Sequence, residues 1–270
     1  MSARRRLDAE LVRRGLATGR GRARALVESG RVTVGGAPAL KAARLVGAGE
    51  AIEVRGDRPR FVSRGGEKLA AALRRFEVDP AGRRVIDVGS STGGFTDCVL
   101  QAGAREVVAI DVGRNQLHER LRADARVQSH EQTNVRHASV ADLGGPGTIV
   151  VADLSFISLR TVALPLLALA EVGADLLLLV KPQFEAGKQE ADRGRGVIRD
   201  PSVWRRTLED VATALSDAGA AIMGVMVSPI TGGDGNVEFL VHAQRDGQPL
   251  GPAAWSTARD AAVTSAGDLL

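Results

Sequence analysis

A glycine-rich stretch between a short apolar run and a helical pattern constrains the fold of this 270-residue chain most strongly. It runs from Asp87 to Phe95 as Asp-Val-Gly-Ser-Ser-Thr-Gly-Gly-Phe, directly after the apolar pair Val85 and Ile86. Glycines at such a turn remove side chains, permit positive φ and expose amide hydrogens beside a helix N-terminus. The pattern predicts a strand, a ligand-binding turn and a helix, with an ordinary tight turn as the alternative.

The spacing of Gly89, Gly93 and Gly94 indicates the kind of ligand. It does not match the G-x-G-x-x-G dinucleotide fingerprint, and the chain has no G-x-x-x-x-G-K-[ST] phosphate loop. A second predicted strand, 106–110, is followed by Asp111, about twenty residues beyond the glycine loop, where a carboxylate can bind the hydroxyls of a ribose. We therefore expect an adenosyl cofactor without phosphates rather than a nicotinamide dinucleotide or ATP.

Seven apolar runs predict the strands of a sheet. They lie at 84–88, 106–110, 126–130, 148–152, 174–180, 221–227 and 237–243, and helical patterns separate most of them. This alternation is typical of an α/β fold with a doubly wound, mostly parallel sheet, in which ligands bind at the carboxyl ends of the strands.

Composition argues against several other classes of protein. No apolar run approaches the roughly 18 residues of a membrane span, and the arginine-rich start lacks the apolar segment of a secretory signal. The single cysteine, Cys98, excludes an intrachain disulfide, and with only four histidines it argues against a structural metal site. We expect a cytoplasmic protein that needs no metal.

Positive charge is concentrated at the beginning of the chain. Residues 1–64 hold 15 Lys and Arg against 6 Asp and Glu, whereas the remaining residues hold 21 against 26. Such an asymmetry is typical of a nucleic-acid-binding part attached to an enzyme, because phosphates attract clustered cations. A merely solvated basic surface is the alternative, and the change of sign between the two parts argues against it.

The basic part has the pattern of a small α+β domain. Apolar positions predict a helix from Leu7 to Gly15 and a second one to about Ser29, then a strand and tight turn at 32–36 and a closing strand at 51–54. This unit resembles the S4 domain, an RNA-binding module, through Leu11, Arg14, Gly15, Leu16, Ala23, Leu26, Gly30, Val32, Val34 and Gly35. We predict an S4-like domain at 1–57, a linker at 58–62 and a second domain at 63–270. The arginines expected to bind RNA are Arg4, Arg6, Arg14, Arg20, Arg24 and Arg64.

Four charged residues are candidates for catalysis. Asp153 follows the fourth predicted strand and Lys181 the fifth, Lys68 lies near the start of the first helix of the second domain, and Glu238 lies at the last strand. The chain has four lysines against 32 arginines. We therefore expect lysine at positions where arginine cannot perform the same function. An amine can lose its proton inside a protein, whereas a guanidinium cannot. Lys181 is therefore a candidate base, with a strand-end salt bridge to Asp153 as the alternative.

The second domain resembles the FtsJ-type ribose 2′-O-methyltransferases, and the whole chain resembles the TlyA family, in which an S4 domain precedes that fold and which is often catalogued as haemolysin A. The matching stretches are Ser63-Arg64-Gly65, Lys68-Leu69, Asp87-Val88-Gly89 with Ser91-Thr92-Gly93-Gly94-Phe95-Thr96, Asp111-Val112-Gly113, Thr133-Asn134, Asp153-Leu154-Ser155-Phe156-Ile157-Ser158-Leu159, Val180-Lys181-Pro182-Gln183-Phe184-Glu185 and Gly235-Asn236-Val237-Glu238. They span nearly the whole chain in the expected order.

The resemblance implies a Rossmann-like class I methyltransferase fold with seven strands, S-adenosylmethionine as methyl donor, and a catalytic set of Lys68, Asp153, Lys181 and Glu238. In that set Lys181 would take the proton of a ribose hydroxyl and Asp153 would orient it. The implied cofactor site comprises Asp87, Gly89, Ser90, Ser91, Thr92, Gly93, Gly94, Phe95, Asp111, Val112, Thr133, Asn134 and Asp153. Asp111 would bind the ribose and Asn134 the adenine, unless Asn134 serves only as a turn residue.

In this family the substrate is ribosomal RNA and the modified nucleotide is a cytidine, so the resemblance implies 16S or 23S rRNA within ribosomal subunits as the partner, and no membrane. The Arg4-Arg5-Arg6 start looks like that of the longer members, which act on both subunits. Two alternatives come from other classes: a pore-forming haemolysin, for which no membrane segment is present, and a non-catalytic RNA-binding assembly factor with a vestigial cofactor site. A methyltransferase acting on protein or a small molecule is the third, and the basic first part argues against it.

Overall fold

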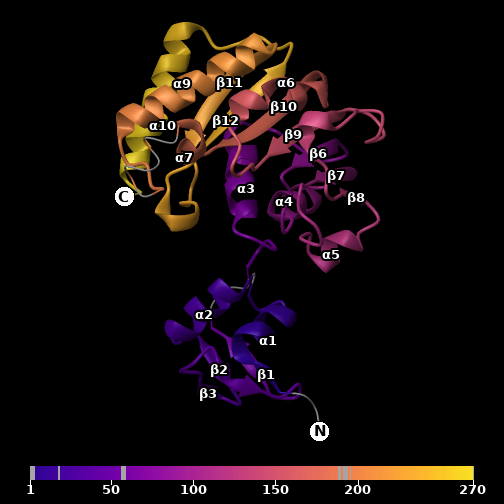
Figure 1. The fold of residues 1–270 in the computed structure, drawn as a ribbon, viewed down its shortest axis with the longest axis vertical. Coiled ribbons are helices and arrows are strands. Elements are labelled where there is room, and N and C mark those ends of the chain that lie inside the picture. The colour runs from indigo at the N-terminus through magenta and orange to yellow at the C-terminus, as the bar shows by residue number, and fades with distance from the viewer. Residues whose placement is uncertain are drawn as a thin grey trace. The chain divides into compact units, whose positions relative to one another are not determined.

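The computed structural model of the chain describes residues 4–17, 19–55, 59–187, 190, 194 and 196–269. The chain divides into two compact units, Met1–Ser63 and Arg64–Leu270, and each is described by itself (Figure 1). The linker proposed at 58–62 lies just before this division, and its residue 58 lies outside the described residues.

The first unit packs two helices with short antiparallel strands. Helices α1 (Leu7–Arg13) and α2 (Arg20–Glu28) contact each other, and β3 (Ala37–Pro38), β2 (Val32–Val34) and β5 (Ile52–Val54) form a sheet in that order. Apolar side chains from both helices and from β2 share one small core, which includes Leu7, Leu11, Leu26 and Val32. The two helices, the strand and the closing strand that the sequence predicts are all present.

A further strand pair in this unit was not predicted. Strand β1 (Arg5–Arg6) pairs antiparallel with β4 (Leu45–Val46), and the Leu7 amide donates to the Arg44 carbonyl oxygen at 2.7 Å. Two exposed arginines carry no alternating apolar pattern from which a strand can be recognised. The basic start of the chain is therefore held extended against its own domain.

The second unit is built on a seven-stranded sheet in the order β11-β12-β10-β9-β6-β7-β8 (Figure 1). Its strands are β6 (Arg84–Val88), β7 (Glu106–Ile110), β8 (Val127–His130), β9 (Gly147–Ala152), β10 (Ala170–Val180), β11 (Ala220–Val227) and β12 (Phe239–Arg245). Strand β12 pairs antiparallel with β10 and with β11, and the other strand pairs of this sheet are parallel. The mostly parallel α/β sheet is thus confirmed. Strand β10 begins before the predicted 174 because its first residues form an irregular segment, across which the register with β9 shifts.

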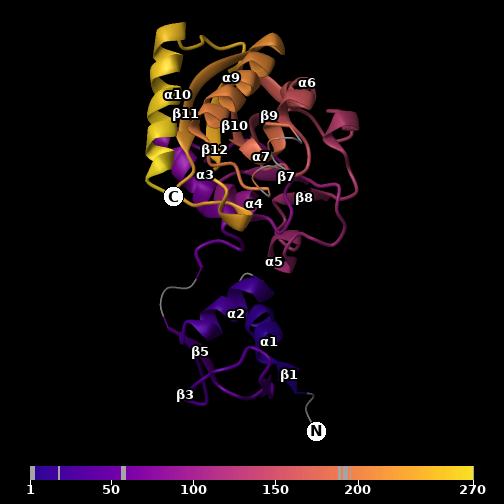
Figure 2. The same cartoon turned by 60° about the vertical axis from the view of Figure 1, so that its left-hand side comes forward.

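Helices lie on both faces of this sheet (Figure 2). On one side α3 (Gly65–Arg75) and α4 (Gly94–Gln101) contact each other, and α4 packs on β6 and β7. On the other, α9 (Pro201–Asp217) and α10 (Pro252–Gly267) pack on β11 and on each other, and α6 (Ala163–Ala168) packs on β10. The short elements between them are α5 (Glu119–Arg122), η1 (Val135–His137), η2 (Leu159–Thr161), α7 (Pro182–Glu185) and η3 (Gly233–Gly235).

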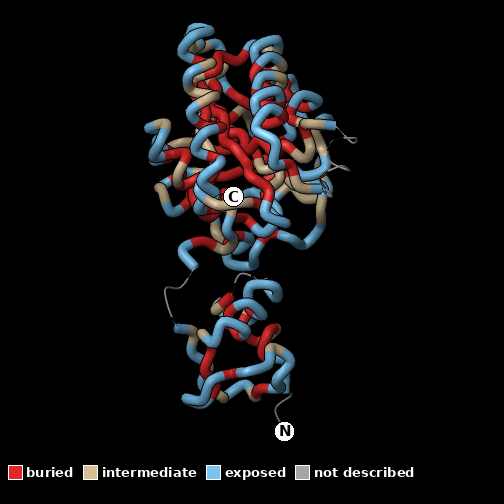
Figure 3. Tube along the Cα trace, turned by 90° about the vertical axis from the view of Figure 1, so that its left-hand side faces the viewer, coloured by how far each residue is buried: buried red, intermediate tan, exposed pale blue. Residues whose placement is uncertain are grey.

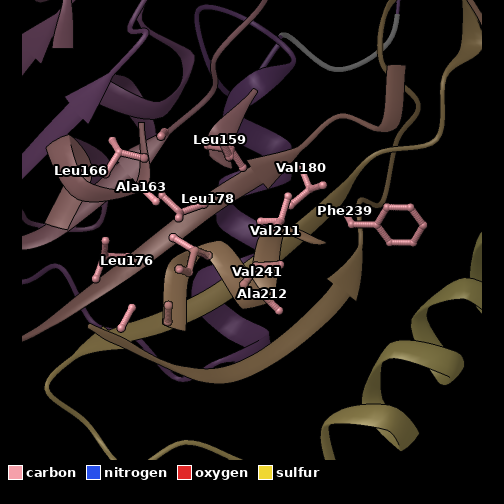
Figure 4. Packing of buried hydrophobic residues seen from close by; sticks show 14 of the residues in the cluster. Leu159, Ala163, Leu166, Leu176, Leu178, Val180, Val211, Ala212, Phe239 and Val241 are labelled. Atoms are coloured by element: carbon pink, nitrogen blue, oxygen red, sulfur yellow. The ribbon is translucent and has the colours of Figure 1, made fainter. Parts of the chain in front are cut away.

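The core of the second unit is aliphatic. Alternate residues of β10, Leu176, Leu178 and Val180, pack with Leu166 of α6 and Val211 of α9 (Figure 4). The buried stretches of the chain run through the interior of this unit while the outer sides of the helices are exposed (Figure 3). This packing holds the strand ends, which carry the polar residues, in fixed register.

Two further findings concern the described residues only. Within the ranges given above, no helix is long and apolar enough to cross a membrane. Nor does that part of the chain bring together three or more His, Cys, Asp or Glu side chains in a way that could hold a metal ion. Cys98 is buried in α4.

Candidate active site

Three strand ends bring charged residues to one edge of the large sheet. Strand β10 pairs parallel with β9 and antiparallel with β12, and Val180 lies opposite Phe239. Asp153 follows β9, Lys181 follows β10 and Glu238 precedes β12. The register of the sheet therefore places all three at the same edge, which is the carboxyl edge of its parallel strands, as the sequence predicts.

The four predicted catalytic residues form two ion pairs. Lys181 Nζ lies 2.6 Å from Asp153 Oδ1 and donates a hydrogen bond to Ser155 Oγ at 2.9 Å. Lys68 Nζ, from α3, donates to Glu238 Oε2. Lys68, Lys181 and Glu238 are buried. The strand-end salt bridge between Lys181 and Asp153 is thus present.

A tight turn before β12 encloses the Glu238 carboxylate. A Cβ atom at Gly232 would lie 2.2 Å from Glu238 Oε1, so only glycine fits there without displacing the carboxylate. The Gly232 amide donates to the Asn236 carbonyl oxygen at 2.8 Å, and the Asn236 side chain bonds two backbone groups of the 196–198 segment. This turn holds the carboxylate against Lys68.

A cavity of about 510 Å³ includes Asp153 and Ser155 in its wall. Its lining comprises Val88, Gly89, Ser91, Ile110, Asp111, Val112, Gln116, Thr133, Asn134, Val135, Asp153, Leu154, Ser155, Phe156 and Ile157. This volume falls in the range typical of small-molecule sites. Part of the predicted cofactor set lies in the wall: Gly89, Ser91, Asp111, Val112, Thr133, Asn134 and Asp153.

Two glycines of the loop stand where a side chain would collide with a neighbouring part of the fold. Gly89 has φ +84°, and a Cβ atom there would lie 2.7 Å from the Asp153 carbonyl oxygen. Gly93 has φ +94° at the start of α4, and its Cβ would lie 2.2 Å from Leu121 Cδ1. Side chains at these two positions would collide with the backbone after β9 and with α5. The remaining predicted cofactor residues of this strand, loop and helix do not line the cavity: Asp87, Ser90, Gly94 and Phe95 are buried, and Thr92 is exposed.

Two polar residues line the cavity, one directly after β7 and one in the segment after β8. The Asp111 carboxylate accepts hydrogen bonds from the backbone amides of Ser91 and Gly113, both at 2.7 Å. These bonds fix an acceptor group in the wall, where ribose hydroxyls can donate to it. Asn134 lines the cavity and also caps η1, because its Oδ1 accepts from the Arg136 amide at 3.0 Å. It is therefore a turn residue, and its contact with adenine stays a prediction.

Asp87 is fully buried at the end of β6. Its Oδ2 accepts from Thr96 Oγ1 at 2.6 Å, whereas no group among the described residues bonds its Oδ1. Burial raises the pKa of Asp87 to about 7, the hydrogen bond from Thr96 opposes that rise, and the charge of Asp153 adds to it. A buried acceptor without a partner beside the glycine loop fits a ligand that carries a donor or a positive charge.

Asp87→Asn is expected to flatten the pH dependence of stability. Because the pKa is raised from 3.8 to about 7 on folding, the native state binds the proton more tightly, and the wild type loses stability as pH rises between these values. The full shift in the pKa of Asp87 corresponds to a loss of at most about 4 kcal/mol in the free energy of unfolding. Asparagine keeps an acceptor for Thr96 and has no proton to lose. Thermal midpoints measured across this pH range test the expectation, and parallel curves for both proteins would contradict it.

Phe156 lies in one of the stretches that match the family, but it was not among the predicted site residues. Its side chain is 91% exposed, and its φ of 64° is a left-handed conformation that is strained for a bulky residue. Its ring centroid lies 5.2 Å from that of Phe184, whose ring centroid lies 5.9 Å from Lys181 Nζ. Phe156 and Phe184 each follow a strand end that also carries a catalytic candidate. This position in the sequence is the signal from which they could have been predicted as site residues. Ser155, the partner of Lys181, was missed in the same segment.

The arginines predicted to bind RNA differ in their surroundings. Arg4 and Arg64 are exposed. Arg14 is 21% exposed and donates to Glu10 Oε1 at 2.7 Å and to the carbonyl oxygens of Glu50 and Ala48 at 2.7 and 2.8 Å. Its guanidinium therefore ties α1 to the turn before β5, so its donors are largely engaged within the domain.

The fold and the site define a Rossmann-like methyltransferase with an attached RNA-binding module. The FtsJ-like methyltransferase family matches residues 61–245, and the S4 domain family matches residues 5–52. The chain therefore belongs to the FtsJ-like methyltransferase family and carries an S4 domain before the catalytic fold.

The individual relatives share this architecture. The chain is 47% identical over 242 residues to a Mycobacterium tuberculosis protein named 16S/23S rRNA (cytidine-2′-O)-methyltransferase TlyA, covering 89% of this chain and 90% of the relative. It is 35% identical over 239 residues to Hemolysin A of Brachyspira hyodysenteriae, covering 88% and 98%. A solved structure from Streptococcus thermophilus that carries the hemolysin name matches with a TM-score of 0.79 and 37% identity, covering 100% of this chain and 98% of that one. The resemblance to the TlyA family is thus confirmed.

Proposed function

We propose that this protein transfers a methyl group from S-adenosylmethionine to the ribose 2′-hydroxyl of a cytidine in ribosomal RNA. The observation that carries the proposal is the contact of Lys181 with Asp153 and Ser155, two residues in the wall of a cofactor-sized cavity. The Mycobacterium tuberculosis relative, which is matched over 90% of its length, bears the name of this activity. A ribosomal substrate implies action in the cytoplasm.

The cavity suits S-adenosylmethionine, which supplies an electrophilic methyl group on sulfur and carries no phosphate. Gly89 and Ser91 would lie along its amino-acid end, and Asp111 would accept from the ribose hydroxyls. The unpartnered oxygen of Asp87 lies behind the glycine loop and would accept a hydrogen bond from a donor group of the cofactor. No residue in this proposal requires a metal ion.

Lys181 is the proposed base. A ribose hydroxyl is a weak acid, so its proton must leave as the oxygen attacks the methyl carbon. The oxygen–carbon bond forms, the carbon–sulfur bond breaks, and the proton passes to Lys181, which must by then have given its own proton to water. Asp153, 2.6 Å from Nζ, then stabilises the ammonium that forms. This ion pair also favours the ammonium before the reaction, so it does not by itself support the role of base, which rests on the contact of Lys181 with two residues of the cavity wall. The ion pair of Lys68 and Glu238 would fix the hydrogen bonds around the attacking oxygen.

Phe156 is the proposed platform for the target nucleotide. Most of its ring is exposed, so a nucleobase can stack on it while the ribose approaches Lys181. Stacking of a base on an aromatic side chain is worth about 1–3 kcal/mol. Phe156→Ala is therefore expected to lower kcat/KM for RNA about fivefold to a hundredfold, whereas Phe156→Trp retains activity. Steady-state kinetics with cofactor titrations check this. A defect confined to cofactor affinity would contradict the proposed platform.

Transfer of labelled methyl groups tests the proposed function. The full chain is incubated with labelled S-adenosylmethionine and each ribosomal subunit separately, with free ribosomal RNA and with ribosomal protein. The proposal expects label in RNA and none with Lys181→Ala. Absence of label in RNA despite measurable cofactor binding would overturn the ribosomal assignment. Leakage of liposomes caused by the pure protein would instead support the pore-forming alternative.

A further inference from the structure

One buried carboxylate in the first unit collects three arginines. Asp8, in the first turn of α1, is 0% exposed. Arg6 of β1 donates to it through Nε at 3.1 Å and Nη2 at 2.9 Å. Arg20 Nη2 lies 3.4 Å from Oδ1, and Arg24 Nε lies 3.5 Å from Oδ2. Residues from β1, α1 and α2 thus meet at a single anionic group.

The charges of this cluster do not balance. The hydrogen bond from Arg6, followed by those of Arg20, lowers the pKa of Asp8 well below its usual range, so the carboxylate is ionised at neutral pH. It can neutralise only one of the three guanidinium groups around it. The cluster therefore carries a surplus of positive charge, and it is held together because the carboxylate offsets the mutual repulsion of the arginines.

Most N–H donors of Arg20 and Arg24 are not bonded to Asp8. A guanidinium has five N–H groups, and the bonds to Asp8 engage one from Arg20 and one from Arg24. The side chains of Arg6, Arg20 and Arg24 are 43%, 56% and 55% exposed. Arg20 and Arg24 lie one turn apart on α2 and so present their forks side by side. Fixed guanidinium forks of this kind match the oxygen atoms of phosphate groups.

The neighbouring carboxylate shows the contrast. Glu10 is also buried and binds Arg13 and Arg14 at 2.6 and 2.7 Å, and these bonds, Arg13 first, lower its pKa to about 2. Arg14 completes its hydrogen bonding on backbone carbonyl groups and is the least exposed of these arginines. That network serves the fold of the domain. Arg13 is exposed like the arginines around Asp8, so the Asp8 cluster differs in two ways: the contacts of Arg20 and Arg24 are longer, and it gathers three exposed arginines where Glu10 holds one.

We propose that Asp8 is a positioning residue, which holds Arg6, Arg20 and Arg24 together as one binding site for the phosphodiester backbone of RNA. The inference deepens the proposed function and rests on its RNA substrate. Without the carboxylate the three like charges would separate, and their forks would have to be ordered again at each binding event.

Asp8→Asn distinguishes the positioning of the arginines by Asp8 from the effect of net charge on RNA binding. The substitution removes a negative charge from a domain that binds RNA, so charge alone predicts tighter binding. Positioning predicts the opposite, an affinity for ribosomal subunits about threefold to tenfold weaker and a reduced salt dependence, because ordered phosphate contacts are lost. Glu53→Gln, an exposed position on β5, makes the same charge change away from the cluster and is expected to leave affinity equal or slightly tighter. Binding of the full chain is measured at several salt concentrations.

A second variant keeps the test valid if Asp8→Asn unfolds the first unit. Arg24→Lys leaves both Asp8 and the net charge unchanged but removes the fork, and we expect affinity to fall severalfold. The positioning role would be overturned if a folded Asp8→Asn protein bound as tightly as the wild type or more tightly, or if Arg24→Lys kept wild-type affinity. In either case, methyl transfer by the wild type would still support the proposed function. Failure of the wild type to bind subunits or free RNA would overturn both.

Discussion

Lys181→Arg is expected to lower the rate of methyl transfer by a factor of about a thousand or more while cofactor affinity stays near that of the wild type. Arginine can keep the ion pair with Asp153, but a guanidinium cannot give up its proton, so it cannot act as the base. Loss of a general base typically costs a factor of about 10² to 10⁴. Single-turnover rates on ribosomal subunits, together with cofactor binding by calorimetry, check both parts.

A matched control for this variant is Lys41→Arg, the same exchange at an exposed lysine of the first unit. It should leave the rate unchanged, because arginine supplies the same surface charge. Turnover by Lys181→Arg at the wild-type rate would remove Lys181 from the role of base. Parallel loss of cofactor affinity would instead indicate that the larger side chain disturbs the cavity.

Lys68→Met is expected to lower the free energy of unfolding by about 3–5 kcal/mol, because it leaves the Glu238 carboxylate buried without its partner. Both side chains are less than a tenth exposed, so water cannot replace the lost contact readily. The double variant Lys68→Met with Glu238→Leu removes both charges and should recover most of the stability, since a buried ion pair is often no more stabilising than an apolar pair of similar volume.

Urea unfolding of the two single variants and the double variant measures this coupling. The double variant should still be inactive if the pair orders the reacting hydroxyl. A double variant as unstable as Lys68→Met would show that the turn at Gly232, which encloses the carboxylate, fits no apolar side chain. Full activity of the double variant would remove the pair from the catalytic set.

The sequence predicts the framework of the second unit well, and the reason is physical. Strands buried on both faces appear as uninterrupted apolar runs, so β6 and β7 begin and end where the sequence places them. Because parallel strands end at one edge, the same runs also predict that Asp153 and Lys181 meet. The family resemblance places Lys68 and Glu238 in one catalytic set, but it does not predict their ion pair, since residues so distant in sequence carry no local sign of contact.

What the sequence could not show depends on side-chain packing. The pattern treats Arg6, Arg14, Arg20 and Arg24 alike, although Arg14 is engaged with backbone carbonyl groups and the other three converge on Asp8. An acidic residue in the first turn of a helix is ordinarily read as a favourable charge for the helix dipole, so burial of such a residue has no sequence signal. The exposure of Phe156 depends in the same way on a backbone conformation that no local pattern requires.

The most direct test of the central claim is to map the methylated atom in the RNA product. Ribosomal subunits treated with the wild type or with Lys181→Arg and S-adenosylmethionine are stripped of protein, and the RNA is hydrolysed with alkali. A 2′-O-methyl group blocks cleavage, so we expect a resistant linkage at a cytidine after treatment with the wild type and none after treatment with the variant. A methyl group on a base or on protein, or a resistant linkage that persists with Lys181→Arg, would contradict this expectation.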